Sequence, residues 1–346
     1  MSSPKTLSHA DYSVAWICAL PLERAASTSM LDEEHARLPQ ASNDPNSYTL
    51  GEVCGHNVVV ACLPAGIYGT LSAAAIAIQM RCTFFAIRFA MMVGIGGGVP
   101  NKKADIRLGD VVVSKPTGTS GGVVQYDYGK TISGGQFERI GALDKPPQAL
   151  LIGVNSLESS YMVGKRNLCE IISNTLERNP KMKTSFASPG PHHDLLFNAN
   201  YDHKGSEDTC ANCSRDQLVS RAQRSFNEPQ VHYGLIASGN QVMKDGKTRD
   251  RLAKELGILC FEMEAAGLMD QIPCLVIRGI CDYSDSHKNN HWQRYAGLTA
   301  AAYAKQLLSV ITPDKSRNTE MLHGNILLHD GISWWKEDAD ISRPKQ

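Results

Sequence analysis

Short apolar runs alternate along the chain with stretches whose apolar residues recur at helical spacing. Continuous apolar runs predict buried β-strands over residues 12–20, 58–63, 84–93, 108–113, 231–237 and 274–280. The helical pattern predicts helices over residues 23–31, 71–80, 249–256, 262–271 and 297–311. Alternation of strand and helix signals is typical of an α/β fold.

The middle of the chain interrupts this pattern. Residues 114–229 are polar and rich in Gly, Pro, Ser and Asn, with one helical stretch near 150–176. We interpret them as an insertion into one α/β domain spanning 11–311, with 185–227 as a long excursion. Residues 312–346 are polar, contain two tryptophans and are predicted to form a C-terminal tail.

Composition narrows the possible classes of protein. The chain has 346 residues with 35 Lys and Arg against 35 Asp and Glu, and a neutral chain is a poor binder of nucleic-acid phosphates. No apolar stretch approaches the roughly 18–20 residues that span a bilayer, and residues 1–11 lack a secretory apolar segment. Most of the ten cysteines lie in apolar runs, as buried thiols do. We therefore expect a cytoplasmic protein that binds neither nucleic acid nor membrane.

A glycine cluster, residues 94–98, follows the predicted strand 84–93. It does not match a dinucleotide fingerprint, because Val99 occupies the third glycine position and Pro100 follows where a helix should begin. The cluster could bring backbone close to a ligand or form a tight turn with positive φ. No cofactor is expected.

Charged residues interrupt two apolar segments near the C-terminal part of the core. Glu262 and Glu264 suit sugar hydroxyls as partners, or alternatively an exposed helix N-terminus. Arg278 interrupts a strand, and Asp282 follows at the strand end, which is the edge where α/β sheets bind ligands. An aspartate there can act as a general acid or can cap a turn.

These segments together carry a family resemblance. The chain resembles the nucleoside phosphorylase and nucleosidase superfamily, of the purine/uridine phosphorylase and methylthioadenosine nucleosidase type. It is most similar to the fungal branch, whose domain also occurs at the N-terminus of NLR-like receptors. The match covers roughly residues 11–311 and rests on six ordered motifs, at 18–23, 94–98, 108–113, 238–240, 262–264 and 278–282.

The resemblance implies a phosphorylase-like three-layer α/β/α fold with a mixed, distorted central sheet. It implies that Glu264 accepts hydrogen bonds from the ribose 2′- and 3′-hydroxyls, with Met263 beneath the sugar. Asp282 would protonate N7 of a purine, and Arg278 would support the loop that follows. Other implied substrate-binding residues are Glu262, Gly94, Ile95, Gly96, Asn240, Gln241 and Val242. Val242 falls near the place of the family's aromatic stacking residue. A homo-oligomer is also implied, since a neighbouring subunit often completes the 5′ end of the site.

Glu23 decides between hydrolysis and phosphorolysis. The nucleosidases carry a glutamate here that handles the attacking water, whereas the bacterial purine phosphorylases carry a phosphate-binding arginine. A second phosphate-binding arginine of those enzymes is replaced by Met92, and the serine that follows is replaced by Ile95. We therefore predict a purine nucleosidase acting on adenosine, inosine or guanosine, with Glu23 and Asp282 catalytic.

Three alternatives to this function stay open. Arg24 could restore phosphate binding if the register slips by one, which would give a purine nucleoside phosphorylase. The basic segment 244–249 or the pair 287–288 could hold the 5′-phosphate of an adenine nucleotide, although solvated charge explains both as well. The domain could also be a catalytically silent nucleoside sensor.

One motif of the insertion falls outside the family pattern. His203 precedes Cys210 and Cys213, and a Cys-x2-Cys pair with a nearby histidine is compatible with structural zinc. Reduced, unliganded cysteines explain the same residues, so no metal is assigned.

Overall fold

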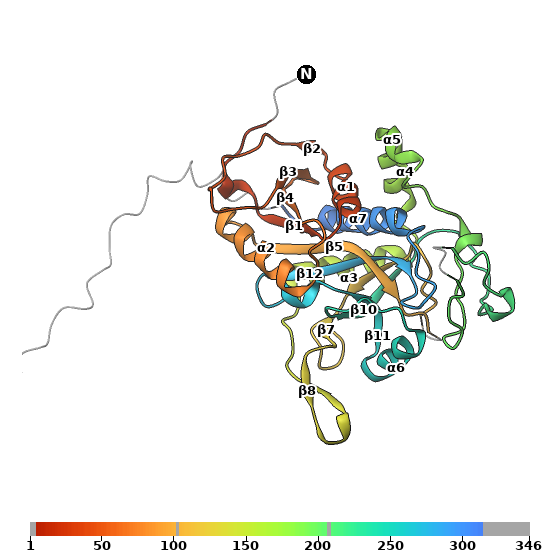
Figure 1. Ribbon diagram of the computed structural model, residues 1–346. Helices are drawn as coiled ribbons and strands as arrows, with labels where there is room; N and C mark the ends of the chain where they lie inside the picture. The colour runs from red at the N-terminus through yellow and green to blue at the C-terminus, as the bar shows by residue number, and fades with distance from the viewer. Residues whose placement is uncertain (1–4, 102–103, 206–208, 314–346) are drawn as a thin grey trace, which may run out of the picture. The chain divides into compact units, whose positions relative to one another are not determined.

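The computed structural model describes residues 5–101, 104–205 and 209–313. The predicted tail, except for its first two residues, lies outside them. Residues up to 313 form one compact unit, and the course of its elements can be followed in Figure 1. Among the described residues, no helix is both long and apolar enough to cross a membrane.

A mixed ten-stranded sheet organises the molecule. Its strands are β1 (Val14–Cys18), β2 (Glu33–Glu34), β3 (Tyr48–Val53), β4 (His56–Cys62), β5 (Phe89–Gly98), β6 (Val111–Ser114), β7 (Val123–Gln125), β10 (Val231–Ser238), β11 (Ile258–Glu262) and β12 (Cys274–Asp282). They are ordered β11-β10-β6-β12-β5-β1-β4-β3-β2, with β7 paired to β10. β1, β4, β5 and β12 run parallel where they pair, whereas β12 pairs antiparallel with β6.

The sheet closes on itself on one side. β11 pairs parallel with β10 and antiparallel with β5, so that five strands, β5, β12, β6, β10 and β11, form a ring. Strands β1, β4, β3 and β2 continue from β5 as an open sheet. This closure is the distortion that the family resemblance implies, and it brings the C-terminal ends of β5, β11 and β12 to one place.

Helices cover both faces of the sheet. The core on one face is completed by α1 (Pro21–Ser29), α3 (Gln148–Met162), α4 (Cys169–Arg178) and α7 (Gln293–Val310). The core on the other face is completed by α2 (Thr70–Thr83) and by residues 265–272. The predicted three-layer α/β/α fold is therefore confirmed. A short α5 (Pro180–Lys183) follows α4, and α6 (Gly246–Leu256) packs near β10 and β11.

Two predicted elements differ from the structure. The predicted helix over 262–271 is wrong, because Glu262 ends strand β11 and only a 3-10 turn, Ala265–Gly267, follows. Strand β11 starts directly after Gly257, which ends α6 in the left-handed conformation. The predicted strand over 84–93 is displaced: β5 starts at Phe89 and contains the glycine cluster, none of whose members has positive φ.

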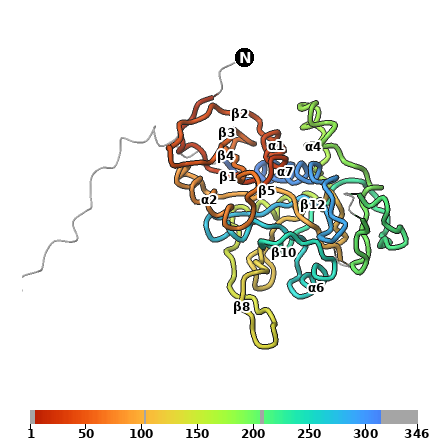
Figure 2. The backbone as a smooth tube through the Cα atoms, in the orientation of Figure 1, coloured from red at the N-terminus to blue at the C-terminus, as the bar shows by residue number. Residues whose placement is uncertain are grey.

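The polar middle segment has structure of its own. Besides α3, α4 and α5 it contributes strand β7 and a hairpin of β8 (Gly129–Thr131) and β9 (Phe137–Arg139). The hairpin extends away from the sheet, as Figure 2 shows. Three single 3-10 turns lie at Ser133–Gly135, Pro191–His193 and Arg215–Gln217, and another lies near the N-terminus at His9–Asp11. Among the described residues of 185–227, no helix longer than these turns and no extended strand is present.

Packing of α7 on β12 depends on one glycine. A Cβ at Gly279 would overlap the backbone carbonyl of Ala296, and backbone cannot move aside as a flexible side chain can. Gly279→Ala should therefore lower the free energy of unfolding by about 3 kcal/mol or more. Urea unfolding measures the change. Gly153→Ala is the matched control, because its Cβ would meet only side-chain atoms of Leu307 and Ile311; equal losses in both variants would contradict the argument.

Candidate active site

A cavity of about 260 Å³ lies where β1, β5, β11 and β12 end. Its lining contains most of the predicted site residues, namely Glu23, Ile95, Gly96, Gln241, Val242, Glu262, Met263, Glu264, Arg278 and Asp282. These residues come from five separated parts of the chain. The sheet closure is what brings them together.

Glu23 is fixed by backbone donors. It is the third residue of α1, and its Oε2 accepts hydrogen bonds from the N–H groups of Ala19 and Leu20, at 2.7 and 2.9 Å. Its Oε1 accepts from the N–H of Ile95 at 2.7 Å. Burial raises the pKa of Glu23, although Arg278 and the three N–H donors act in the opposite direction. The carboxyl group is thus held rigidly at one end of the cavity.

Arg278 is a buried cation among carboxyl groups. Its side chain is 1% exposed and ion-pairs with Glu262 and with Glu264, the latter at 3.4 Å from Nη2 to Oε2. Burial by itself would lower the pKa of Arg278, but the carboxylates outweigh it and raise the pKa. Its Nη1 also donates to the carbonyl of Ile95. The guanidinium therefore supports the carboxylates of the site rather than the loop after β12.

The carboxyl group of Glu264 has a raised pKa. Burial raises the pKa of Glu264 to about 7; Arg278 opposes this, and the nearby Glu262 and Glu23 add to it. Glu262 itself accepts hydrogen bonds from the N–H groups of Glu264 and Ala265, at 3.2 and 3.0 Å. Glu262 is thus committed to structure. Glu264 lines the cavity, and the hydrogen bond from the backbone of Met263 does not offset the effect of its burial.

The glycine cluster makes room for these charged side chains. A Cβ at Gly94 would lie less than 3.0 Å from Glu23 and Arg278, and one at Gly97 would lie less than 3.0 Å from Ser284 and Asp282. No member of the cluster has positive φ, so the turn is wrong. Gly96 and Gly97 line the cavity, and the approach of bare backbone to a ligand there stays a prediction. Absence of Cβ atoms lets β5 lie against the residues of the site.

Asp282 ends β12 and is held from two sides. Its Oδ1 accepts from the N–H of Ser284 at 2.8 Å, and its Oδ2 lies 3.0 Å from Nζ of Lys288. Burial lowers the pKa of Lys288, but pairing with Asp282 outweighs it and raises the pKa. Interpretation of Lys288 as solvated charge is therefore wrong. Ser284 has φ of 53°, and its buried Oγ has no hydrogen-bond partner among the described residues.

Two predicted residues do not line the cavity. Gly94 lies behind Glu23 and Arg278. Asn240 is exposed, and its Oδ1 accepts hydrogen bonds from the N–H and the hydroxyl of Thr70, where α2 begins. Five lining residues of functional interest are absent from the predicted set, namely Tyr68, Met243, Phe261, Ser284 and Lys288. Phe261, Met243 and Ser284 lie within two residues of predicted site residues, and Lys288 belongs to the pair considered for a 5′-phosphate, whereas no pattern marks Tyr68.

Other basic residues considered from sequence point elsewhere. Arg24 donates to the hydroxyl of Thr49 at 3.0 Å and is not among the residues that line the cavity. Arg249, from the basic segment 244–249, is buried and donates to the carbonyl of Tyr283 at 2.8 Å. Arg249 therefore braces the loop after β12, and its assignment to solvated charge is wrong.

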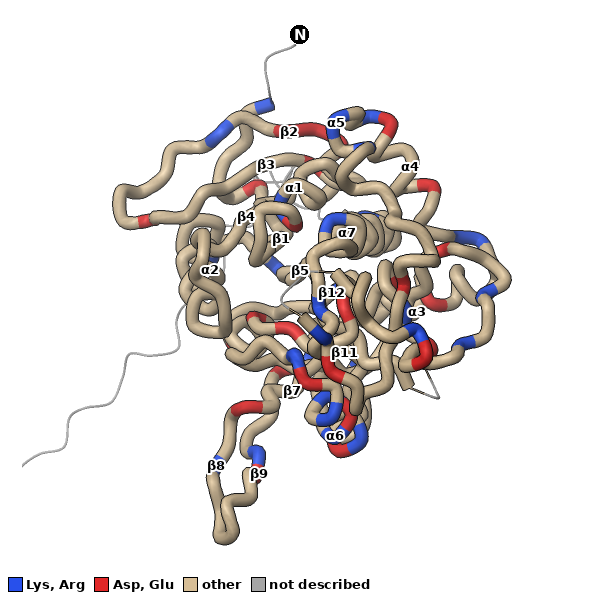
Figure 3. Tube along the Cα trace, turned by 45° about the vertical axis from the view of Figure 1, so that its right-hand side comes forward, with Lys and Arg blue, Asp and Glu red and all other residues tan. Residues whose placement is uncertain are grey.

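The charge balance of the cavity is acidic. Among the described lining residues, four carry carboxyl groups, Glu23, Glu262, Glu264 and Asp282, and two carry cationic groups, Arg278 and Lys288. Both cations are already paired with carboxylates. Figure 3 shows charged positions of both signs meeting around β11 and β12.

Residues 13–313 match the family model of the phosphorylase superfamily. The chain belongs to this superfamily. An NLR-like protein of the fungus Hyaloscypha variabilis is 45% identical over 322 residues, which are 93% of this chain and 31% of that protein. A 5′-methylthioadenosine/S-adenosylhomocysteine nucleosidase of Mycobacterium bovis is 32% identical over 99 residues, 27% of this chain and 39% of that enzyme. The chain thus spans about a third of the length of these relatives.

Solved structures of superfamily members share the fold. The 5′-methylthioadenosine/S-adenosylhomocysteine nucleosidase of Neisseria meningitidis, bound to methylthio-immucillin-A, superposes with a TM-score of 0.55 at 17% identity, covering 86% of this chain and 98% of that one. The futalosine hydrolase of Helicobacter pylori gives 0.53 at 16% identity, covering 87% and 99%. The phosphorylase-superfamily fold therefore spans most of the present chain.

The raised pKa of Glu264 predicts a pH-dependent stability. Folding favours the protonated group, so its stabilising contribution is complete below pH 4.5 and is lost as pH rises through 7. Glu264→Gln, which stays neutral, should gain stability relative to the native protein between pH 4.5 and 8. The gain should reach up to about 3 kcal/mol, at about 1.4 kcal/mol per pKa unit. Urea unfolding across this range measures it.

The exposed Glu177 provides the control, because Glu177→Gln should track the native protein at every pH. A Glu264→Gln variant whose stability difference from the native protein does not change with pH would show that Glu264 has an ordinary pKa.

Proposed function

We propose that this protein is a purine nucleosidase, which hydrolyses the N-glycosidic bond of a purine nucleoside to free base and ribose. The observation that carries the proposal is the buried carboxyl group of Glu23, fixed at the cavity wall by the N–H groups of residues 19, 20 and 95. A carboxylate in this place suits the orientation and deprotonation of a water molecule. It does not suit the binding of a phosphate dianion.

The surrounding charges support hydrolysis over phosphorolysis. A phosphate site needs cationic donors that are free to pair with it. Arg278 is paired with Glu262 and Glu264, and Arg24 is turned toward Thr49. A phosphate placed near Glu23 would meet three carboxyl groups. The phosphorylase alternative loses the residue on which it depended.

The sugar would lie over the segment 262–264. Glu264 would accept hydrogen bonds from the ribose hydroxyls, and Met263 would pack beneath the ring, as the resemblance implies. A ribosyl oxocarbenium-like transition state carries positive charge. The carboxyl groups of Glu23 and Glu264 lie in one buried cavity with it and stabilise that charge.

The base would lie near the end of β12. Phe261 and Tyr68 line the cavity and offer aromatic surface that the half-exposed Val242 does not. The unpaired hydroxyl of Ser284 is available to a ring nitrogen or exocyclic group. A purine leaves as a neutral molecule if N7 receives a proton while the C1′–N9 bond breaks and its electron pair passes to the base.

The acid would be the Asp282 and Lys288 pair. An ionised carboxylate has no proton to give, so Asp282 must receive one, from Lys288 or from water, before N7 takes it. Glu23 removes a proton from the attacking water, whose oxygen bonds to C1′. The proton taken by Glu23 returns through solvent to the Asp282 and Lys288 pair, so that one nucleoside and one water are consumed and one base and one ribose are formed.

A second candidate function is a silent nucleoside-binding module. The similarity that favours it is the 45% identity to a fungal NLR-like protein that is about three times longer than the matched region. Such a module would bind nucleoside in the same cavity without releasing base.

Base release distinguishes these functions. Purine nucleosides, 5′-methylthioadenosine and adenine nucleotides should be incubated with the protein in phosphate-free buffer and again with added phosphate, and products separated by chromatography. We expect free base and unphosphorylated ribose from at least one purine nucleoside at a rate that phosphate does not change. Glu23→Gln and Asp282→Asn should each lower kcat by about 100-fold or more, since each removes a proton-transfer group.

Glu177→Gln again serves as the control and should retain full activity. Ribose 1-phosphate as the product would overturn hydrolysis. Nucleoside binding, measured by calorimetry, without release of any base would establish the silent module instead. Full turnover by Glu23→Gln would remove Glu23 from the mechanism.

A further inference from the structure

Part of the insertion packs against the loop that follows Asp282. Phe197 stacks on His287 with ring centroids 4.0 Å apart, and the backbone N–H of His203 donates to Oγ of Ser286 at 2.9 Å. Phe197, Cys210 and Cys213 form a small buried cluster of their own, separate from the main core. Few apolar contacts therefore hold this part of the insertion in place.

Three potential metal ligands meet in that cluster. The ligating atoms of His203, Cys210 and Cys213 all lie within 4.8 Å of one another. Cys210 and Cys213 are 8% and 5% exposed. The N–H of Cys213 donates to the carbonyl of Cys210 at 3.2 Å, so the Cys-x2-Cys segment is a tight turn with both thiols near each other.

One ring nitrogen of His203 is left with a lone pair. Its Nε2 lies 3.0 Å from the carbonyl oxygen of Thr209, and because a carbonyl can only accept, Nε2 carries the proton. Nδ1 therefore keeps its lone pair. Donation of the other ring N–H to a backbone carbonyl is the arrangement usual for metal-ligating histidines, where it fixes the tautomer.

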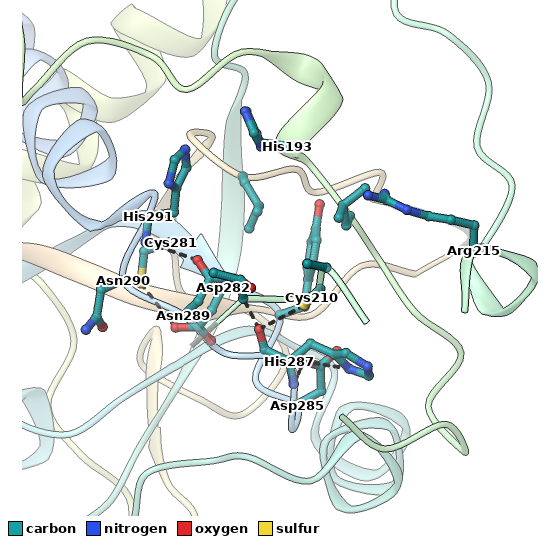
Figure 4. A pocket seen from close by; sticks show the side chains of 15 residues that line it. His193, Cys210, Arg215, Cys281, Asp282, Asp285, His287, Asn289, Asn290 and His291 are labelled. Atoms are coloured by element: carbon teal, nitrogen blue, oxygen red, sulfur yellow. Dashed lines mark hydrogen bonds and ion pairs between the residues drawn. The ribbon is translucent and has the colours of Figure 1, made fainter. Parts of the chain in front are cut away.

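A fourth ligand is at hand on the loop after β12. His287 is 6% exposed. Its Nδ1 lies 3.7 Å from Oδ1 of Asp285, and neither ring nitrogen has a hydrogen-bond partner among the described residues. Its ring lies edge-to-face beside that of His203 at 5.6 Å, and its backbone carbonyl lies 4.0 Å from Sγ of Cys210. In Figure 4 Cys210 and His287 lie side by side, close to Asp282 and Asp285.

We propose that His203, Cys210, Cys213 and His287 bind one structural Zn²⁺ per chain. Structural zinc prefers four tetrahedral Cys and His ligands, which places donor atoms about 3.5–3.8 Å apart. The ligating atoms of His203, Cys210 and Cys213 already lie within 4.8 Å of one another, and His287 would complete the site by turning its ring toward them. The site would join the insertion to the loop beyond Asp282 and supply stability that this small cluster lacks.

Nothing in this inference rests on the nucleosidase proposal. Its ligands lie outside the 260 Å³ cavity, at the edge of a second cavity of about 560 Å³ that shares Cys281 and Asp282 with it. Binding and stability, rather than turnover, are therefore the measurements that test it.

The full chain should first be purified under reducing conditions without chelator and its metal content measured by elemental analysis. We expect about one zinc per chain. After removal of zinc, titration with Co²⁺ should give thiolate-to-cobalt charge-transfer absorption in the near ultraviolet and the strong visible bands of a tetrahedral site. Chelation should lower Tm, and Zn²⁺ should restore it.

Four variants locate the ligands. Cys210→Ser, Cys213→Ser and His203→Gln should each weaken Co²⁺ binding by more than about 100-fold. Loss of a group that only orients a ligand weakens binding by roughly 10- to 100-fold. His287→Ala should do the same if it is the fourth ligand. Cys82→Ser, at an exposed free cysteine, should bind Co²⁺ as the native chain does.

The proposal would be overturned if the purified chain contained no zinc, if its Tm did not change with chelator or Zn²⁺, and if Co²⁺ gave no thiolate-to-cobalt absorption. These measurements use the native chain and hold even if every variant fails to fold. A disulfide between Cys210 and Cys213 in the protein purified under reducing conditions, seen as a mass 2 Da lower by the loss of two hydrogens, would overturn it too. Unchanged Co²⁺ affinity in His287→Ala would remove His287 from the site.

Discussion

The charge of Arg278 is the constraint around which the site is built. A guanidinium at 1% exposure is stable only because carboxylates surround it, and they in turn would be costly to bury without it. Glu262 is committed to this pairing and to backbone donors, which leaves Glu264 and Glu23 to face the cavity. Strand β12 thus holds the site together through a residue that need not touch the substrate.

Closure of the sheet brings the partners of Arg278 within reach. Because β11 pairs with both β10 and β5, its last residue Glu262 lies beside β12 although the two strands are not neighbours in the sheet order. In an open sheet of this order, β10 and β6 would lie between β11 and β12 and would separate Glu262 from Arg278. The buried ion pair and the ring of five strands therefore depend on each other.

Much of the fold was predictable from sequence because its parallel strands are buried on both faces. Continuous apolar runs marked β1, β4, β10 and β12 with boundaries within a few residues. β11 was missed because its five residues run straight into the acidic segment 262–264, whose pattern also suits a helix. Short edge strands such as β2 have too few residues to carry any period.

Most residues of the site were predictable, but their partners were not. Glu23, Glu264 and Asp282 stand in recognisable motifs, and all three line the cavity. Lys288 and Arg249 look like surface charge in sequence, since burial of a long basic side chain depends on which carboxylate or carbonyl the fold supplies. Tyr68 reaches the cavity from a loop without a pattern, so only three-dimensional structure finds it.

The glycines of β5 also bear on how new substrate preferences can arise in this protein. A Cβ at position 94, 97 or 98 would meet a neighbour at less than 3.0 Å, so this strand, of which Gly96 and Gly97 line the cavity, leaves little room for larger residues. Tyr68 and Val242 also line the cavity but are 47% and 49% exposed, and half-exposed side chains are replaced at a lower cost in stability than buried ones. Variation among natural or laboratory-selected descendants should accumulate at this rim while the floor of the pocket stays constant.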